Sequence, residues 1–116
     1  MGRNLTAAEY REQVNHAMTE ATLQKKCELA LRELGCLHWH AYDSRRSAPG
    51  FPDLTVVTPD GRLAFLELKV ENRSRGRISE HQKRWLDALG KVEGVTVAVI
   101  RPSNYDWLVQ WARGEM

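Results

Sequence analysis

Cysteines and long apolar runs are scarce in the 116-residue sequence. Cys27 and Cys36 are too few for the disulfide framework of a small secreted protein, so we expect both as reduced thiols. No apolar segment approaches the roughly 20 residues that cross a bilayer, and the first ten residues lack the apolar core of a secretory signal. Because 42% of the residues are hydrophobic, the chain is also too apolar to be disordered. We therefore expect a soluble domain that functions in the cytoplasm.

The chain shows neither an internal repeat nor a linker. At 116 residues, a second hydrophobic core would leave neither half enough interior, whereas one core buries roughly two-thirds of the unfolded surface. We predict a single domain over residues 1–116, in which residues 1–18 form an N-terminal helical extension.

The formal net charge is only +2, but the charge is unevenly distributed. Residues 45–101 contain eleven basic and seven acidic side chains, whereas residues 1–44 contain five basic and six acidic ones. The basic excess is concentrated in two short segments, which contain Arg45, Arg46, Arg73, Arg75 and Arg77. A single segment of this kind is usually a solvated loop. Two of them, flanking the carboxylates described below, predict a surface for a polyanion.

Capping signals and apolar periodicity predict the order of the secondary structure. Capping boxes occur at residues 6–9 and 79–82, and Thr19 can cap a second helix after a break near Met18. The predicted helices cover residues 6–18, 19–34 and 79–90, with a last helix from residue 102. The predicted strands cover residues 36–42, 53–58, 62–70 and 95–100. The third strand, its helix and the fourth strand form a crossover unit, so we predict an α/β fold with a mixed four-stranded sheet flanked by helices.

The first strand alternates, with Leu37, Trp39 and Ala41 on one face and Cys36, His38 and His40 on the other. This alternation predicts a half-buried strand. The cysteine and the two histidines could also indicate a zinc site. No convincing fourth ligand accompanies them, so we favour packing and polar contacts.

The hairpin between the second and third strands brings two carboxylates together. A three-residue turn over residues 59–61 makes Thr58 pair with Arg62, so that the numbers of paired residues sum to 120. Asp53 then faces Glu67 with Cβ atoms roughly 5 Å apart. The strand alternation places Lys69 on the same side of the sheet.

Two carboxylates at this distance repel each other unless a positive charge lies between them. A hard divalent ion bound by oxygen atoms meets this need, and Mg²⁺ is the expected occupant. The alternative is a surface pair in which Lys69 neutralises one carboxylate. Leu63 and Phe65 share the face and indicate that it is partly covered, which weakens this alternative.

Glu20 and Gln82 interrupt the apolar stripes of their helices, and each has two interpretations. Glu20 either complements the helix dipole as a first-turn carboxylate or points toward the sheet and contributes to the site. Gln82 either completes the capping box of Ser79 or contributes to the site. The sequence leaves both choices open.

At this point the residues have a recognisable pattern. Gly50-Phe51-Pro52-Asp53 and Glu67-Leu68-Lys69, with Glu20 in a preceding helix and Gln82 in a following one, resemble the motifs of the PD-(D/E)xK nuclease superfamily. The spelling SRRSAPGFPDL…LELK…ISEHQKRWLDAL is similar to its VRR-NUC family, in the small stand-alone form found in phages and bacteria. The resemblance extends from about residue 19 to residue 103.

The resemblance implies a restriction-endonuclease-like αβββαβ core and a DNA endonuclease activity. It also implies that Asp53, Glu67 and the backbone carbonyl of Leu68 bind Mg²⁺ or Mn²⁺, with Glu20 as a further ligand. Lys69 would orient or deprotonate the attacking water. Stand-alone members resemble homodimeric Holliday-junction resolvases, which implies branched DNA as the substrate and a homodimer. For the dimer interface we consider two candidates, the helix over residues 7–18 and the pair Trp107 and Trp111, and the sequence does not decide between them.

We therefore expect metal-dependent hydrolysis of DNA phosphodiester bonds, in which Gln82 holds a ligand or a phosphate. The expected contacts to backbone phosphates come from Arg45, Arg46, Arg73, Arg75, Arg77 and Lys83. Two alternatives remain at this stage. One is an endonuclease that nicks duplex DNA or cuts it at a sequence, and the other is a DNA-binding module that kept the fold without catalysis.

Overall fold

The computed structural model describes residues 4–41 and 48–115. The elements appear in the predicted order, and an additional 3-10 helix precedes the last α-helix. They are α1 (Ala7–Ala17), α2 (Glu20–Glu33), β1 (Leu37–His40), β2 (Leu54–Val57), β3 (Leu63–Leu68), α3 (Glu80–Gly90), β4 (Val95–Ile100), η1 (Pro102–Asn104) and α4 (Tyr105–Ala112). The predicted α/β class is confirmed.

The four strands form one mixed sheet in the order β1-β2-β3-β4. β1, β2 and β3 are antiparallel neighbours, whereas β4 runs parallel to β3 after the α3 crossover. In the β2–β3 hairpin Leu54 pairs with Leu66, and the Thr58 N–H donates to the Arg62 carbonyl at 2.9 Å. The predicted hairpin register is therefore confirmed.

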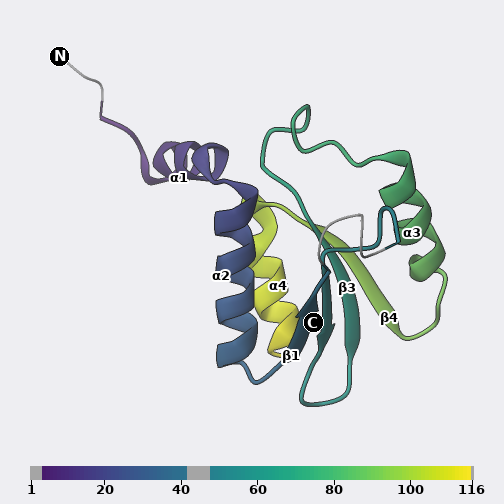
Figure 1. The fold of residues 1–116 in the computed structure, drawn as a ribbon. Coiled ribbons are helices and arrows are strands. Elements are labelled where there is room, and N and C mark those ends of the chain that lie inside the picture. The colour runs from purple at the N-terminus through teal and green to yellow at the C-terminus, as the bar shows by residue number, and fades with distance from the viewer. Residues whose placement is uncertain (1–3, 42–47, 116) are drawn as a thin grey trace.

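The helices cover the two faces of the sheet unequally, as Figure 1 shows. α2 and α4 pack on one face, and α3 lies on the other face beside β4. The core lies beneath α2 and α4. It includes the buried residues Leu23, Cys27 and Leu31 of α2, Leu54 and Val56 of β2, Leu66 of β3 and Leu108 of α4. Cys27 and Cys36 are both free and buried in this core, and burial raises the pKa of the Cys27 thiol to about 12.

In β1 the exposed face is the apolar one. Leu37 is 75% exposed and Trp39 is 56% exposed, whereas His38 and His40 are half-buried. The pairing of β1 with β2 places Leu37 and Trp39 on the open face, where α3 covers only the β4 side. His38 Nε2 lies 3.7 Å from a carboxylate oxygen of Glu28 on α2. The burial of this strand is therefore decided by the position of α2 and not by the hydropathy of the strand.

α1 begins with the predicted capping box of Thr6 and Glu9 and ends at Met18. Thr19 then caps α2, which confirms the predicted break between the two helices. The structure describes every residue of α1, and none of them is buried. The helix extends away from the sheet (Figure 1). Within residues 4–41 and 48–115, no helix combines the length and apolarity needed to span a membrane.

Candidate active site

The hairpin brings Asp53 and Glu67 together, as their register predicts. Asp53 directly precedes β2, and its Oδ2 accepts a hydrogen bond of 2.7 Å from the backbone N–H of Leu68. Glu67 lies in β3, and only 1% of its surface is exposed. The charge of Lys69 acts on Glu67 and opposes the repulsion from Asp53. Two acids and an amine therefore converge at one end of the sheet.

Glu67 is an unusual carboxyl group. Burial raises its pKa to about 9, and the negative charge of Asp53 adds to the shift. Its Oε2 is buried and has no hydrogen-bond partner in the described part of the protein. A buried acceptor without a donor costs roughly 1–3 kcal/mol. A bound divalent cation would supply the missing positive partner, so these two carboxylates fit such an ion.

Gln82 makes both of the contacts that the sequence left open, one within the capping box and one to a carboxylate of the site. Its Oε1 accepts from the Ser79 N–H at 2.9 Å, and the Ser79 hydroxyl accepts from the Gln82 N–H at 3.2 Å, which completes the capping box. Its Nε2 also donates to Glu67 Oε1 at 3.1 Å. One amide group therefore starts α3 and orients a carboxylate of the site.

Glu20 is the first residue of α2 and lies at the edge of the site. Its pKa is raised, first by burial and then by the negative charge of Asp53, while the charges of Lys69 and His40 lower it. Among the described residues, however, no three His, Cys, Asp or Glu side chains are arranged to hold a metal ion. The site thus consists of Asp53 and Glu67, with Glu20 within electrostatic reach.

The chain before Asp53 is pressed against the first turn of α3, a contact that the sequence pattern did not reveal. Gly50 has a φ of +81°, and a Cβ there would lie 2.6 Å from the Gln82 nitrogen and would collide with the His81 backbone. Phe51 follows and packs edge to face on Phe65 and on Trp85, with centroid distances of 5.9 and 5.0 Å. The GFPD motif therefore joins the Asp53 segment to the helix that carries Gln82.

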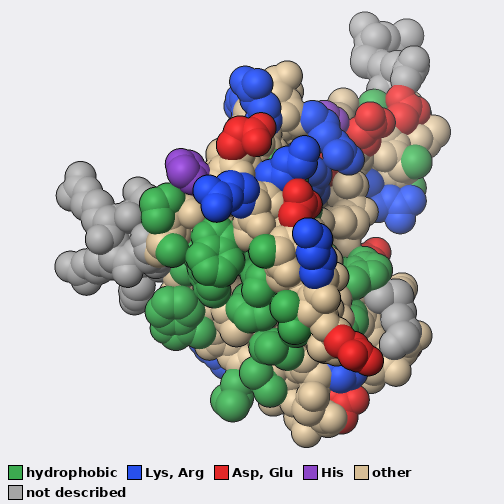
Figure 2. All heavy atoms as spheres, turned by 90° about the vertical axis from the view of Figure 1, so that its right-hand side faces the viewer, with side chains coloured by type: hydrophobic (Ala, Val, Ile, Leu, Met, Phe, Trp, Pro, Cys, Tyr) green, Lys and Arg blue, Asp and Glu red, His purple; other side chains and the backbone are tan. Residues whose placement is uncertain are grey.

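The basic segment after β3 forms an exposed loop. Arg73, Arg75 and Arg77 are exposed on it, as is Lys83 on α3. Figure 2 shows Lys and Arg side chains gathered in the upper part of the view, where the loop and α3 lie in Figure 1, with acidic side chains among them and hydrophobic side chains below them. Arg45 and Arg46 lie outside the described residues.

Arg101 anchors this loop, a role that sequence analysis missed. It is 6% exposed, and its guanidinium donates to the carbonyls of Val70 at 2.7 Å and Gly76 at 3.0 Å. A Cβ at Gly76 would lie 2.7 Å from the Val70 carbonyl oxygen, so the loop closes tightly. The sequence shows only that Arg101 directly follows a predicted buried strand. An arginine exposed to solvent could occupy the same position, so the pattern does not predict its burial.

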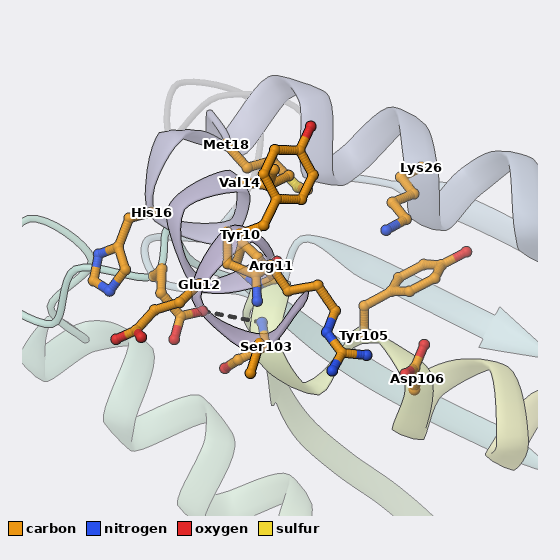
Figure 3. A pocket seen from close by; sticks show the side chains of 14 residues that line it. Tyr10, Arg11, Glu12, Val14, His16, Met18, Lys26, Ser103, Tyr105 and Asp106 are labelled. Carbon is orange, nitrogen blue, oxygen red and sulfur yellow. Dashed lines mark hydrogen bonds between the residues drawn. The ribbon is translucent and has the colours of Figure 1, made fainter. Parts of the chain in front are cut away.

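A cavity of about 680 Å³ lies away from these carboxylates, between α1 and the start of α4 (Figure 3). Lys26 lies 4.2 Å from the centre of the Tyr105 ring, which also lines it. Basic Arg11 and acidic Glu12 and Asp106 line the same space. This mixture of charges does not favour a polyanion.

Trp107 and Trp111 stack with ring centroids 6.4 Å apart. Trp111 is only 5% exposed and belongs to the core. The prediction that this pair supplies a dimer interface is therefore wrong for Trp111, because the ring is already covered within the chain.

Comparison with known proteins supports a family assignment. Residues 4–104 match the family model of the VRR-NUC domain. A solved structure described as a VRR_NUC domain superimposes with a TM-score of 0.64 and 29% identity, covering 81% of this chain and 97% of that one. No curated protein sequence is similar enough to count as a relative. The family match begins at residue 4 and so includes α1, which lies outside the resemblance described above. The chain has a nuclease-type fold and belongs to the VRR-NUC domain family.

Proposed function

We propose that this protein is a divalent-metal-dependent endonuclease that hydrolyses phosphodiester bonds of DNA. The observation that carries the proposal is the buried, unpartnered Oε2 of Glu67 beside the Asp53 carboxylate. Asp53 and Glu67 would hold the cation, with the Leu68 carbonyl and Glu20 as further oxygen ligands. Mg²⁺ is the proposed ion, and Mn²⁺ would substitute for it. A divalent ion bound there would polarise the phosphate and lower the pKa of a bound water.

The chain itself would position the reacting groups. The Leu68 N–H fixes Asp53, and Gln82 fixes Glu67, so neither carboxylate has to reorganise when DNA binds. Lys69 would orient the attacking water and stabilise the negative charge that develops on the phosphate. Its electrostatic effect on Glu67 supports this role.

DNA would bind across the surface formed by the basic loop after β3 and by α3. Arg73, Arg75, Arg77 and Lys83 would contact backbone phosphates, and Arg45 and Arg46 are proposed to join them. Contacts of this kind give an affinity that falls with salt and little discrimination between bases. A module that only bound DNA would gain nothing from buried carboxylates facing a polyanion, so the site favours catalysis over simple binding.

We further propose that the substrate is branched DNA and that the protein acts on it as a homodimer. One small site makes one cut, whereas a junction presents two symmetry-related strands that a two-fold dimer could cut together. Exposed apolar side chains are available for such an interface. It includes Tyr10 and Val14 on α1, and Leu37, Trp39 and Val57 on the open face of the sheet.

Cleavage assays with four-way-junction, flap and linear duplex DNA would test the proposal. We expect cleavage of the junction in Mg²⁺ that disappears with EDTA and in Asp53→Asn, whereas Asp53→Asn still binds DNA. Asp87→Asn is the matched control, because Asp87 is an exposed acid on α3 and should cut normally. Cleavage at fixed positions of linear duplex would instead identify a sequence-reading enzyme. Binding without cleavage in any divalent metal would identify a binding module.

A further inference from the structure

A second cavity lies between α3 and the segment that precedes Asp53. Its volume is about 460 Å³, and it is lined by Ala48, Pro49, His81, Arg84, Trp85 and Ala88. We call it the Trp85 pocket. No group assigned above to the hydrolysis of the phosphodiester lines it.

The Trp85 indole, which forms the aromatic wall of the pocket, is fixed in place by other aromatic rings. Trp85 is half-buried, and the Phe51 ring meets it at an interplanar angle of 78° with a centroid distance of 5.0 Å. Phe51 is held in turn by Phe65 of β3 at 5.9 Å. A fixed indole offers a planar ligand a stacking surface at little cost in side-chain entropy.

The pocket is lined by the segment that leads to Asp53 and by α3, which carries Gln82. Pro49 lies four residues before Asp53, and Gly50 presses this segment against His81. His81 is followed by Gln82, which donates to Glu67. A strand whose phosphate reached Glu67 would therefore pass within a nucleotide or two of the pocket.

The charge of the lining favours a nucleic acid strand. Arg84 and His81 line the pocket, and no acidic side chain does so among the described residues. Cationic groups attract phosphates, while an indole stacks on any nucleobase. Arginine adds a second planar cation that stacks on bases.

We propose that the Trp85 pocket receives an unpaired nucleobase of the bound DNA strand. The proposal rests on the proposed function, because the occupant is part of the same substrate. The faces of a base inside a duplex are covered by its neighbours, so a base must leave the stack to enter the pocket. The occupant is therefore a base beside the scissile phosphate that is unpaired or that leaves the stack, as a base at the branch point of a junction or flap can do.

Binding to two single-stranded oligonucleotides of equal length would test this proposal. One is oligothymidylate, and the other is an abasic strand with the same phosphates but no bases. Both are titrated in the Asp53→Asn background, so that no strand is cut. We expect oligothymidylate to bind at least ~5-fold more tightly, the ratio that corresponds to about 1 kcal/mol for one stacked base.

Two variants should remove this preference. Ala88→Leu fills the pocket and Trp85→Leu removes the indole, so each should bring the ratio of the two affinities toward 1, the value expected when both strands bind only through their equal backbone charge. Ala17→Leu, at an exposed alanine on α1, is the matched control and should keep the full ratio. If Trp85→Leu does not fold, Ala88→Leu still decides the result.

A ratio near 1 in the Asp53→Asn protein, or a ratio unchanged by Ala88→Leu, would overturn the pocket assignment. The pocket assignment would also be overturned if thymidine monophosphate displaced the bound strand at the same total concentration of bases. The site would then be one for free nucleotides. Loss of the proposed function has a different signature, namely no metal-dependent cleavage of any DNA by the unmodified protein.

Discussion

Gln82 on α3 and Glu67 on β3 are joined by a hydrogen bond of 3.1 Å between their side chains. The same Gln82 amide caps its own helix by accepting from the Ser79 N–H. The start of α3 and the most buried acid of the site are therefore one structural unit.

Replacing Gln82 should affect stability and activity together. Gln82→Ala removes the reciprocal half of the capping box and leaves Glu67 Oε1 without its donor, so we expect a loss of roughly 1–3 kcal/mol and strongly reduced cleavage. Urea unfolding and the junction assay measure the two effects. Glu9→Ala removes the equivalent residue of the α1 capping box, far from the carboxylates, and should leave cleavage intact. Equal activity in the two variants would show that Gln82 only caps its helix.

Stability without metal should fall as the pH rises. The pKa of Glu67 is about 9 in the folded protein against 4.5 ordinarily, so between these values the unfolded chain releases a proton that the folded one keeps. The stabilisation is complete below about pH 4.5 and is lost progressively up to about pH 9. Glu67→Gln cannot ionise and should flatten this slope. It should stabilise the metal-free protein at pH 8 by roughly 1–3 kcal/mol while abolishing cleavage. Thermal unfolding across this pH range, with EDTA present, is the measurement, and parallel slopes in the two proteins would contradict the assignment.

Binding of Mg²⁺ or Mn²⁺ should release a proton. Glu67 is protonated near neutral pH without metal, because its pKa is raised, and it must ionise to act as a ligand. Calorimetry in two buffers of different ionisation enthalpy should show release of about one proton per ion, and affinity should increase from pH 6 to pH 8. Asp53→Asn should bind the ion weakly. Binding by the unmodified protein without proton release would mean that Glu67 is not a ligand.

Gly50 should be far less tolerant of substitution than Gly61. Both have positive φ, at +81° and +86°, but a Cβ at Gly61 meets nothing within 4 Å, whereas one at Gly50 collides with the first turn of α3. Gly61→Ala should cost only the conformational penalty of about 1–2 kcal/mol. Gly50→Ala should cost more than ~2 kcal/mol and should reduce cleavage, because Asp53 and Gln82 move apart. Denaturant unfolding of the pair compares the two costs directly.

The exposed arginines should control the salt dependence of DNA binding. Changing Arg73, Arg75 and Arg77 together to alanine removes up to three phosphate contacts, so the slope of log K against log salt should become shallower by about 2–3. Titrations at several salt concentrations give this slope. A triple alanine variant at Arg11, Lys25 and Arg32, exposed on α1 and α2, is the control and should leave it unchanged. If both triple variants gave the same slope, the basic loop would not be part of the DNA interface.

Local features could be predicted from the sequence because they depend on neighbours in the chain. Thr6, Thr19 and Ser79 cap the helices that follow them, and the three-residue turn sets the hairpin register. The register in turn accounts for the proximity of Asp53 and Glu67. These outcomes follow from hydrogen bonds and turn geometry over a few residues.

The tertiary structure decided what depends on the packing of distant segments. Leu37 and Trp39 are exposed because α2 covers the opposite face of the sheet. Arg101 is buried because a loop 25 residues away closes over it. Glu67 loses its solvation because α3 brings Gln82 onto it, and no pattern within β3 records that contact. The sequence thus determined which side chains carry the chemistry. The packing of helices from elsewhere in the chain determined how far these side chains are shielded from solvent, because burial is a property of the packed layers.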